Sequence, residues 1–152
     1  MNAAAIMLAV AISVGPAMSA PATLMPDMPV KVGNIDVVCT GVGLDARENP
    51  TWRSYPLKIE VAGRDGQYLG DIHLSISQRG NRVVAVSCDG PWLLFGLPAG
   101  KYLIDAETEG KTVSSAVVVP ATGQSRIVLR FPELGGTKAP VTTSASAPPV
   151  TQ

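Results

Sequence analysis

Few residues in this chain of 152 could carry out chemistry, and they are widely spaced. His73 is the only histidine, and its place in an alternating stretch points it away from the apolar side, with no nucleophile or orienting partner nearby in the sequence. Asp105, Glu107 and Glu109 put three carboxylates on one strand face, which suits calcium or a basic partner. Calcium also needs loop carbonyls that wrap the ion, and solvated strand faces show the same spacing. We therefore expect no catalytic residue, no metal and no cofactor.

The charge balance and the small number of metal-binding side chains exclude several classes of function. Lys and Arg number 12 and Asp and Glu also 12, so the formal net charge is zero. Nucleic-acid binding depends on clustered Lys and Arg that release counterions, so we expect no nucleic-acid partner. One His and two Cys are too few for a Cys/His zinc site, and no glycine-rich phosphate loop follows a strand. The composition predicts a protein that is not an enzyme.

The aromatic residues of the middle region are candidates for binding. Trp52, Arg53 and Tyr55 lie in an irregular segment between two prolines, and Tyr68 lies in a later turn. Flat rings with a polar group suit stacking on a sugar or packing on a protein, so these four are candidate ligand or partner contacts. Alternatively, Trp52 covers an open end of the core, since Trp side chains are mostly buried. Trp92 opens an apolar run, so we expect it in the core.

The elements that must position these side chains are strands. Apolar residues recur at every second position in the stretches 35–39, 57–61, 72–76, 84–88, 102–106 and 127–131, and the apolar run 92–97 is a further expected strand. A further strand is expected at 112–119, where valines in both registers leave the inward face undecided. Turns rich in Gly, Asn and Pro separate the stretches. This predicts an all-β fold, an antiparallel β-sandwich of seven to eight strands. The one candidate helix is a single turn, 45–49, with Asp45 as N-cap.

The N-terminus has the features of a secretory signal. Residues 3–14 are apolar and uncharged, too short for a membrane span of roughly 20 residues, and small residues near Ser19 to Ala22 suit cleavage. We expect a periplasmic or secreted protein without a transmembrane helix after signal removal. The predicted organisation is a signal peptide at 1–20, a Pro-rich leader at 21–30, one domain at 31–131 and a disordered Pro/Thr/Ser/Ala tail at 132–152.

The two cysteines fit an exported sandwich. Cys39 and Cys88 both fall on the apolar side of their strands, and exported proteins fold under oxidising conditions. We expect them to form a disulfide, which in the loop-entropy treatment stabilises a loop of this length by ~4 kcal/mol. The alternative is two buried thiols out of bridging reach.

Two neighbouring runs combine into one structural motif. Its members are Gly90, Pro91, Trp92, Leu97, Pro98, Gly100 and Tyr102. The prolines fix φ and lack an N–H, so they belong at strand edges or turns. Tyr102 follows the second turn closely enough for its ring to be buried while its hydroxyl returns to the turn backbone, which is a tyrosine corner.

These runs resemble the carboxypeptidase regulatory-like family, whose domains are transthyretin-like (prealbumin-like) sandwiches with a Leu-Pro-x-Gly-x-Tyr turn. Small exported bacterial proteins of this kind also share segments similar to 40–45, 66–71 and 89–94 here. The resemblance covers about residues 38–131 and implies the fold but no reaction. The transthyretin-like hydroxyisourate hydrolases use several His residues and a C-terminal Tyr-Arg-Gly-Ser, which this chain lacks.

The sequence thus predicts a non-catalytic accessory or interaction domain of the bacterial cell envelope that binds an envelope protein. The alternative is a carbohydrate-binding module that presents the aromatic residues of 50–56 to a glycan. Both expectations rest on fold-level analogy together with the candidate contacts above.

Overall fold

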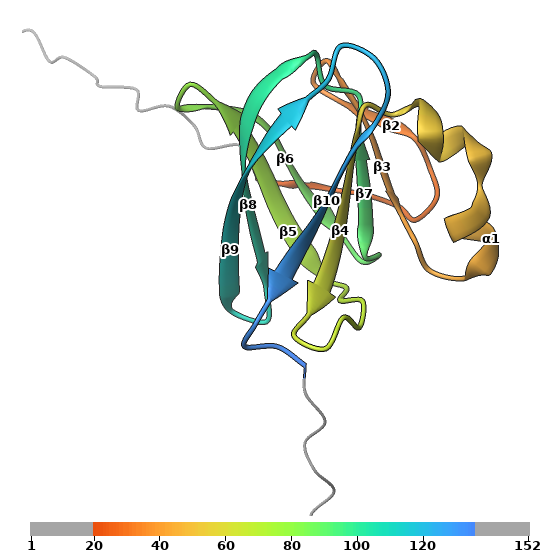
Figure 1. The fold of residues 1–152 in the computed structure, drawn as a ribbon, viewed down its shortest axis with the longest axis vertical. Helices are drawn as coiled ribbons and strands as arrows, with labels where there is room; N and C mark the ends of the chain where they lie inside the picture. Colours follow the sequence, from red (N-terminus) through yellow and green to blue (C-terminus); the bar gives the residue numbers. More distant parts are fainter. Residues whose placement is uncertain (1–19, 136–152) are drawn as a thin grey trace, which may run out of the picture.

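The computed structural model describes residues 20–135, which form two facing β-sheets of five strands each (Figure 1). The predicted β-sandwich is therefore confirmed. Most of the predicted signal peptide, up to residue 19, and the tail beyond residue 135 lie outside the described residues.

Sheet A has the strand order β1-β6-β5-β8-β9. Its strands are β1 (Ala22–Thr23), β5 (Ile72–Gln78), β6 (Asn81–Cys88), β8 (Gly100–Thr108) and β9 (Lys111–Val119). Neighbouring strands are antiparallel, except that β1 runs parallel to β6.

Sheet B has the strand order β10-β4-β7-β3-β2. Its strands are β2 (Val30–Val32), β3 (Ile35–Thr40), β4 (Leu57–Gly63), β7 (Trp92–Phe95) and β10 (Ser125–Phe131). Here too one pair is parallel, because β10 pairs with β4 along its whole length, from Ser125 opposite Leu57 to Phe131 opposite Gly63.

The sheets differ in detail from the expected seven to eight antiparallel strands. β1 and β2 are two and three residues long, too short to show an alternating pattern. β10 follows β9 by a turn that crosses between the sheets, so it does not form a hairpin with the strand before it. Its direction relative to β4 is set by the end of the sandwich at which the chain crosses, and no local pattern encodes this.

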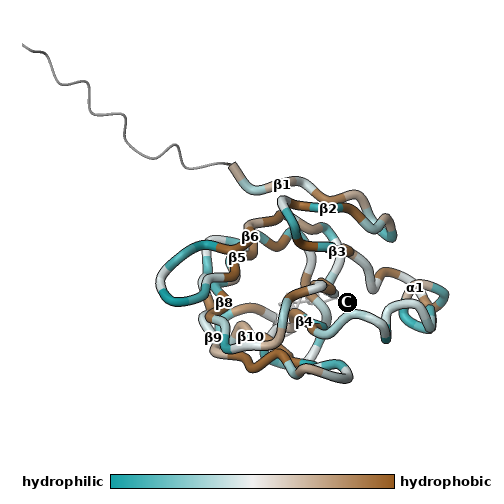
Figure 2. Tube along the Cα trace, turned by 90° about the horizontal axis from the view of Figure 1, so that it is seen from above, coloured by the Kyte–Doolittle hydropathy of each residue, from teal (hydrophilic) through white to brown (hydrophobic). Residues whose placement is uncertain are grey.

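The segment 21–30, expected to be a leader, packs against the domain. Leu24 is buried, and its N–H donates to the carbonyl oxygen of Ser87 at 2.9 Å. The N–H of Asp27 donates to the carbonyl oxygen of Cys39 at 2.7 Å, and its carboxylate accepts a 2.5 Å hydrogen bond from Thr40. This segment therefore runs along one open side of the sandwich, where Figure 2 shows β1 and β2 together.

The core lies between the sheets and consists of the inward-facing residues that the alternation predicted. The largest fully buried side chains include Phe95, Phe131, Leu57, Ile59, Ile72, Leu74, Ile76, Leu93, Ile104 and Leu129. In β9, where the sequence left the face undecided, Val117 and Val119 are buried and Val118 is exposed. The tyrosine corner is present, since the Tyr102 hydroxyl donates to the carbonyl oxygen of Pro98 at 2.7 Å.

One face of sheet B is covered by the segment between β3 and β4. This segment contains α1 (Leu44–Glu48) and a 3₁₀-helix, η1 (Pro50–Ser54). The predicted helical turn is confirmed but begins one residue early, so Asp45 lies in its first turn and is not the N-cap. Figure 1 shows the segment standing outside β3. Neither of these helices, nor any other part of residues 20–135, provides an apolar helix long enough to cross a membrane.

Candidate functional site

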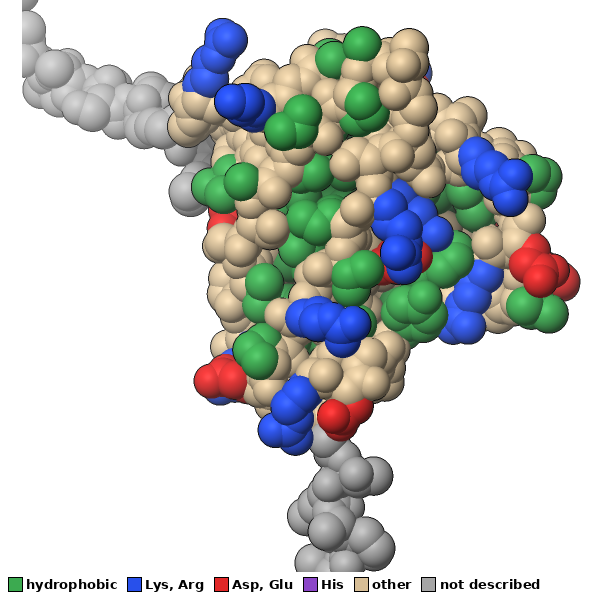
Figure 3. Space-filling view, viewed as in Figure 1, with side chains coloured by type: hydrophobic (Ala, Val, Ile, Leu, Met, Phe, Trp, Pro, Cys, Tyr) green, Lys and Arg blue, Asp and Glu red, His purple; other side chains and the backbone are tan. Residues whose placement is uncertain are grey.

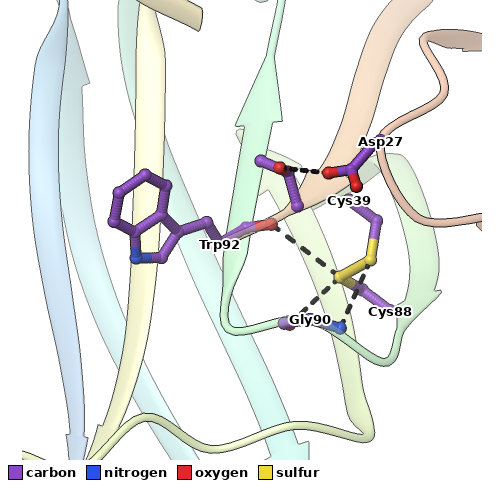
Figure 4. The surroundings of a disulfide bond; sticks show 6 residues. Asp27, Cys39, Cys88, Gly90 and Trp92 are labelled. Atoms are coloured by element: carbon purple, nitrogen blue, oxygen red, sulfur yellow. Dashed lines mark hydrogen bonds between the residues drawn. A yellow bond between two sulfur atoms is a disulfide. The ribbon is translucent and has the colours of Figure 1, made fainter. Parts of the chain in front are cut away.

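The disulfide predicted from the sequence is present and lies at one end of the sandwich. Cys39 is the last residue but one of β3 in sheet B and Cys88 ends β6 in sheet A, with their Cα atoms 5.6 Å apart. Both side chains are buried. Figure 4 shows the Trp92 indole pointing away from the disulfide. The bridge therefore joins the two sheets next to the loops that follow β3 and β6.

Three loops meet tightly beside this disulfide. The N–H of Gly90 lies 3.5 Å from Cys39 Sγ, and a Cβ atom on Gly90 would overlap the carbonyl oxygen of Thr40. A Cβ atom on Gly70 would overlap the carbonyl oxygen of Asp89 in the same way. Only glycine permits such close backbone approach. The loops after β3, before β5 and after β6 are thus fixed against one another by backbone contact.

These three loops line a small, open pocket of about 210 Å³. The loop after β3, together with α1, contributes Gly41, Val42, Gly43 and Arg47 to its lining. The loop before β5 contributes Tyr68, Leu69 and Gly70, and the loop after β6 contributes Asp89 and Pro91. Tyr68 is the one predicted contact residue in it. Gly41 to Gly43 and Asp89 to Pro91 belong to the segments that carry the family resemblance.

Arg47 is the cation of this pocket, and its guanidinium is held in place from two directions. Its Nε donates to the carbonyl oxygen of Gly41 at 2.8 Å. Its Cζ lies 4.8 Å from the centroid of the Tyr68 ring, a cation–π arrangement. Among residues 20–135, no carboxylate forms a salt bridge with it. The two terminal nitrogens can therefore bind an acceptor on a ligand.

A row of aromatic and charged side chains continues from Tyr68 across the outer face of sheet B. The Tyr68 and Trp92 rings meet edge to face, with centroids 6.1 Å apart. Lys58 Nζ lies 3.4 Å from the centroid of the Trp92 ring. Trp92 is buried, as expected, but on the outer side of the sheet and not between the sheets. Its Nε1 has no hydrogen-bond partner within the described part of the chain.

Glu60 is the acidic member of this row. It is only 3% exposed and forms salt bridges with Lys58, at 3.1 Å, and with Arg126. Burial disfavours its charged form, but hydrogen bonds from Arg126 and Lys58 and the charges of both outweigh burial, so the pKa of Glu60 lies below its ordinary value. The row contains three cations, Arg47 included, and one carboxylate. Figure 3 shows Lys and Arg spread over this side of the molecule.

The other three candidate contacts lie apart from the pocket. Trp52 is 6% exposed, packs on Val38 and Leu94, and donates through Nε1 to the carbonyl oxygen of Ala46 at 2.7 Å. Its ring covers the outer side of sheet B, so it is not free to stack on a sugar. Tyr55 packs partly on the same cluster, and burial together with the charge of Asp36 raises its pKa.

The remaining candidate, Arg53, lies exposed in η1. It has no salt bridge among the residues that the structure describes. Of the four predicted contacts, Tyr68 thus lines the pocket beside the disulfide and the other three do not.

The structure brings His73 to a partner that the sequence did not suggest. His73 Nδ1 lies 2.7 Å from Ser87 Oγ, and Glu107 pairs with His73 from the other side on β8. Nucleophilic catalysis can use such residues, but it also needs oxyanion donors and a place for the substrate. His73 and Glu107 are exposed, and His73, Ser87 and Glu107 line neither the Arg47 pocket nor the wider depression along β6. We interpret His73 as a surface residue.

The other acidic candidates do not gather around a site. Asp105 accepts a hydrogen bond from Ser114, and Glu109 lies in the turn between β8 and β9. Across residues 20–135, no cluster of three or more His, Cys, Asp or Glu could hold a metal ion. A wider depression of about 900 Å³ runs along β6 between Ala20 and Asn81 and is lined mostly by small side chains.

No protein-family model matches this chain, and no curated protein is significantly similar to it. The resemblance to the carboxypeptidase regulatory-like family therefore rests on the short motifs and on the sandwich.

Proposed function

We propose that this chain is an exported, non-catalytic binding domain of the bacterial cell envelope that docks on a protein partner through the loop end beside the disulfide. The observation that carries the proposal is a set of exposed apolar side chains around a fixed arginine. Val42 is 64% exposed, Leu44 66% and Tyr68 40%, all close to Arg47. Exposed apolar groups beside Tyr and Arg are typical of the residues that dominate protein interfaces.

The disulfide supports the export part of the proposal. Bonds of this kind persist in the periplasm and outside the cell, and the cytosol keeps thiols reduced. A sandwich with a tyrosine corner also suits the carboxypeptidase regulatory-like assignment, which we retain as part of the proposal, although the two cysteines are not part of that family's pattern.

The carbohydrate alternative is weaker. It depended on the aromatic residues of 50–56, and Trp52 is buried under its own segment while Tyr55 is partly buried. Tyr68 remains, but one face of its ring is stacked by Arg47. Sugar binding normally uses an open ring face, so a protein partner fits this surface better.

Affinity capture tests the proposal. The chain would be fixed to beads and exposed to cell-envelope extract of the source bacterium under mild cross-linking. We expect one protein to be retained by the native chain and lost with Leu44→Asp. Val118→Asp serves as the matched control, since Val118 is 60% exposed on the opposite sheet. Equal retention by both variants, or no retained protein, would contradict the proposal.

A further inference from the structure

Three sequence motifs that are far apart in the chain form a single pocket. The glycine-rich turn after β3, the turn before β5 and the Asp-Gly-Pro turn after β6 all contribute to its lining. Glycine contacts and the disulfide fix the three turns against one another, as described above. Of the residues in its lining, only Leu69 packs against the core between the sheets. The motifs therefore build a defined surface cavity in addition to the fold.

The guanidinium of Arg47 is held in place in this pocket, which favours binding of a carboxylate. Arg47 Nε donates to the carbonyl oxygen of Gly41, and the flat face of the guanidinium lies over the Tyr68 ring. The side chain is therefore ordered before a ligand binds. The planar guanidinium binds carboxylates with two parallel hydrogen bonds. A side chain that is ordered before binding loses less entropy when the ligand arrives.

The charged groups around the pocket are mixed, and Arg47 is the one cation in its lining. Asp89 is the one acidic side chain in the lining, and it forms no salt bridge with Arg47. Asp45, Glu48 and Asp71 also lie in or beside these loops. The attraction for a carboxylate therefore comes from the unpaired guanidinium of Arg47 and not from a net positive charge of the surface.

The size and walls of the pocket indicate a peptide. A cavity of about 210 Å³ is smaller than the pockets that enclose drug-sized ligands, and it suits one or two side chains. Val42 and Tyr68 add exposed apolar surface at its rim. An acidic side chain next to an apolar one would use both features.

We propose that this pocket binds an extended segment of the partner protein, with an Asp or Glu carboxylate on Arg47 and an adjacent apolar side chain on Val42 and Tyr68. This inference rests on the proposed function, because it names the chemistry of the partner that docks at the loop end. It assigns Arg47 as the residue that selects the partner.

A random dodecapeptide library displayed on phage tests the proposal with the full chain as target. We expect the native protein to enrich peptides that contain Asp or Glu beside an apolar residue. One enriched peptide, made synthetically, should shift the amide signals of the three pocket loops in ¹⁵N-labelled protein. Replacing its acidic residue by Asn or Gln should weaken binding about tenfold or more.

Two variants of the protein complete the test. Arg47→Gln and Val42→Glu should each weaken binding of the synthetic peptide about tenfold or more, while the controls Arg53→Gln and Val118→Glu leave it within about twofold. Val42 and Val118 are both exposed, so these two substitutions should not unfold the chain. Thermal melting of each variant checks this.

Enrichment of peptides without acidic residues, equal enrichment on Arg47→Gln, or amide shifts along β6 would overturn the inference. So would the absence of any enriched peptide. If the native chain still captures an envelope protein and Leu44→Asp does not, the proposed function stands and only the binding of an acidic peptide is wrong. If both the capture and the peptide selection give no such result, the proposed function is wrong as well.

Discussion

The outer faces of the two sheets have opposite surroundings, although both follow the same strand alternation. The outer face of sheet A carries small and polar residues such as Ser75, Ala85 and Ser87, and it faces solvent. On sheet B, Val38 and Leu94 point outward and are fully buried, because Trp52 and its short helices lie over them.

The difference lies in the composition of the strands. In β3 and β7 apolar residues occupy both alternating positions, and β7 is buried along its whole length. Strands that are apolar on both sides need cover on both sides. Sheet B therefore has a second layer, whose first loop also borders the pocket of Arg47, whereas none of residues 20–135 forms such a layer over the middle strands of sheet A.

The largest effect that would test this comparison comes from removing the cover. Trp52→Ala should lower the free energy of unfolding by about 3–5 kcal/mol, because the indole leaves a cavity over Val38 and Leu94. Leu103→Ala on the outer face of sheet A is the control and should cost under about 0.5 kcal/mol, since Leu103 is exposed. Urea unfolding followed by fluorescence or circular dichroism measures both. Similar losses for the two variants would remove the distinction between the faces.

The disulfide belongs to both sheets, so its loss should weaken both. The double variant Cys39→Ala with Cys88→Ala should lose about 2–4 kcal/mol of unfolding free energy, mainly because the unfolded chain regains freedom. Hydrogen exchange should rise in β3 and β6 alike. Protection lost in only one sheet would show that the bridge stabilises that sheet alone. Mass spectrometry of the non-reduced native chain should find no alkylatable thiol.

The charged row on sheet B should make stability depend on pH. Since the pKa of Glu60 is lowered in the folded state, its contribution is present above the ordinary value of about 4.3 and is lost as the pH falls through the folded value. Glu60→Gln should cost about 1–3 kcal/mol near neutral pH and flatten this acid decline. Val118→Ala on sheet A removes no ionisable group and is the control, so its acid decline should follow that of the native chain. An unchanged acid decline in Glu60→Gln would contradict the assignment.

The smallest effect is expected on the solvated face of sheet A. His73→Ala should change the unfolding free energy by less than about 0.5 kcal/mol, because the histidine is exposed and its side chain hydrogen-bonds, within residues 20–135, to the surface hydroxyl of Ser87 alone. A fluorophosphonate probe should leave Ser87 unlabelled. Labelling that disappears in His73→Ala would show a working serine nucleophile and would change our interpretation of this face.

Parts of the fold could be predicted because their signals are local. Alternation in 57–61 and 72–76 identifies two central strands and their inward faces, and the spacing of Pro98 and Tyr102 indicates the tyrosine corner. Cysteines on the inward faces of two strands suggested the bridge. β1 and β2 could not be recognised, because two or three residues are too short to show a period.

The candidate site was only partly predictable. Tyr68 was chosen from its residue type and its place in a turn, and it does line the pocket. Arg47 was missed, because a single arginine in a short helix resembles any solvated residue. Its partners, Gly41 and Tyr68, belong to different loops, so only the fold brings them together. A signal was available in the glycines, which cluster in the same three segments.

Local sequence is enough to predict that the chain forms strands, which side chains of most strands face the core, and which two cysteines could pair. Side-chain period and turn composition act over a few residues, so they can be recognised without the fold. Only the folded chain shows that β10 runs parallel to β4, that Trp92 lies on an outer face, and that three separate loops meet beside Arg47. These depend on which strand ends share one end of the sandwich, and pairing between distant strands sets that arrangement.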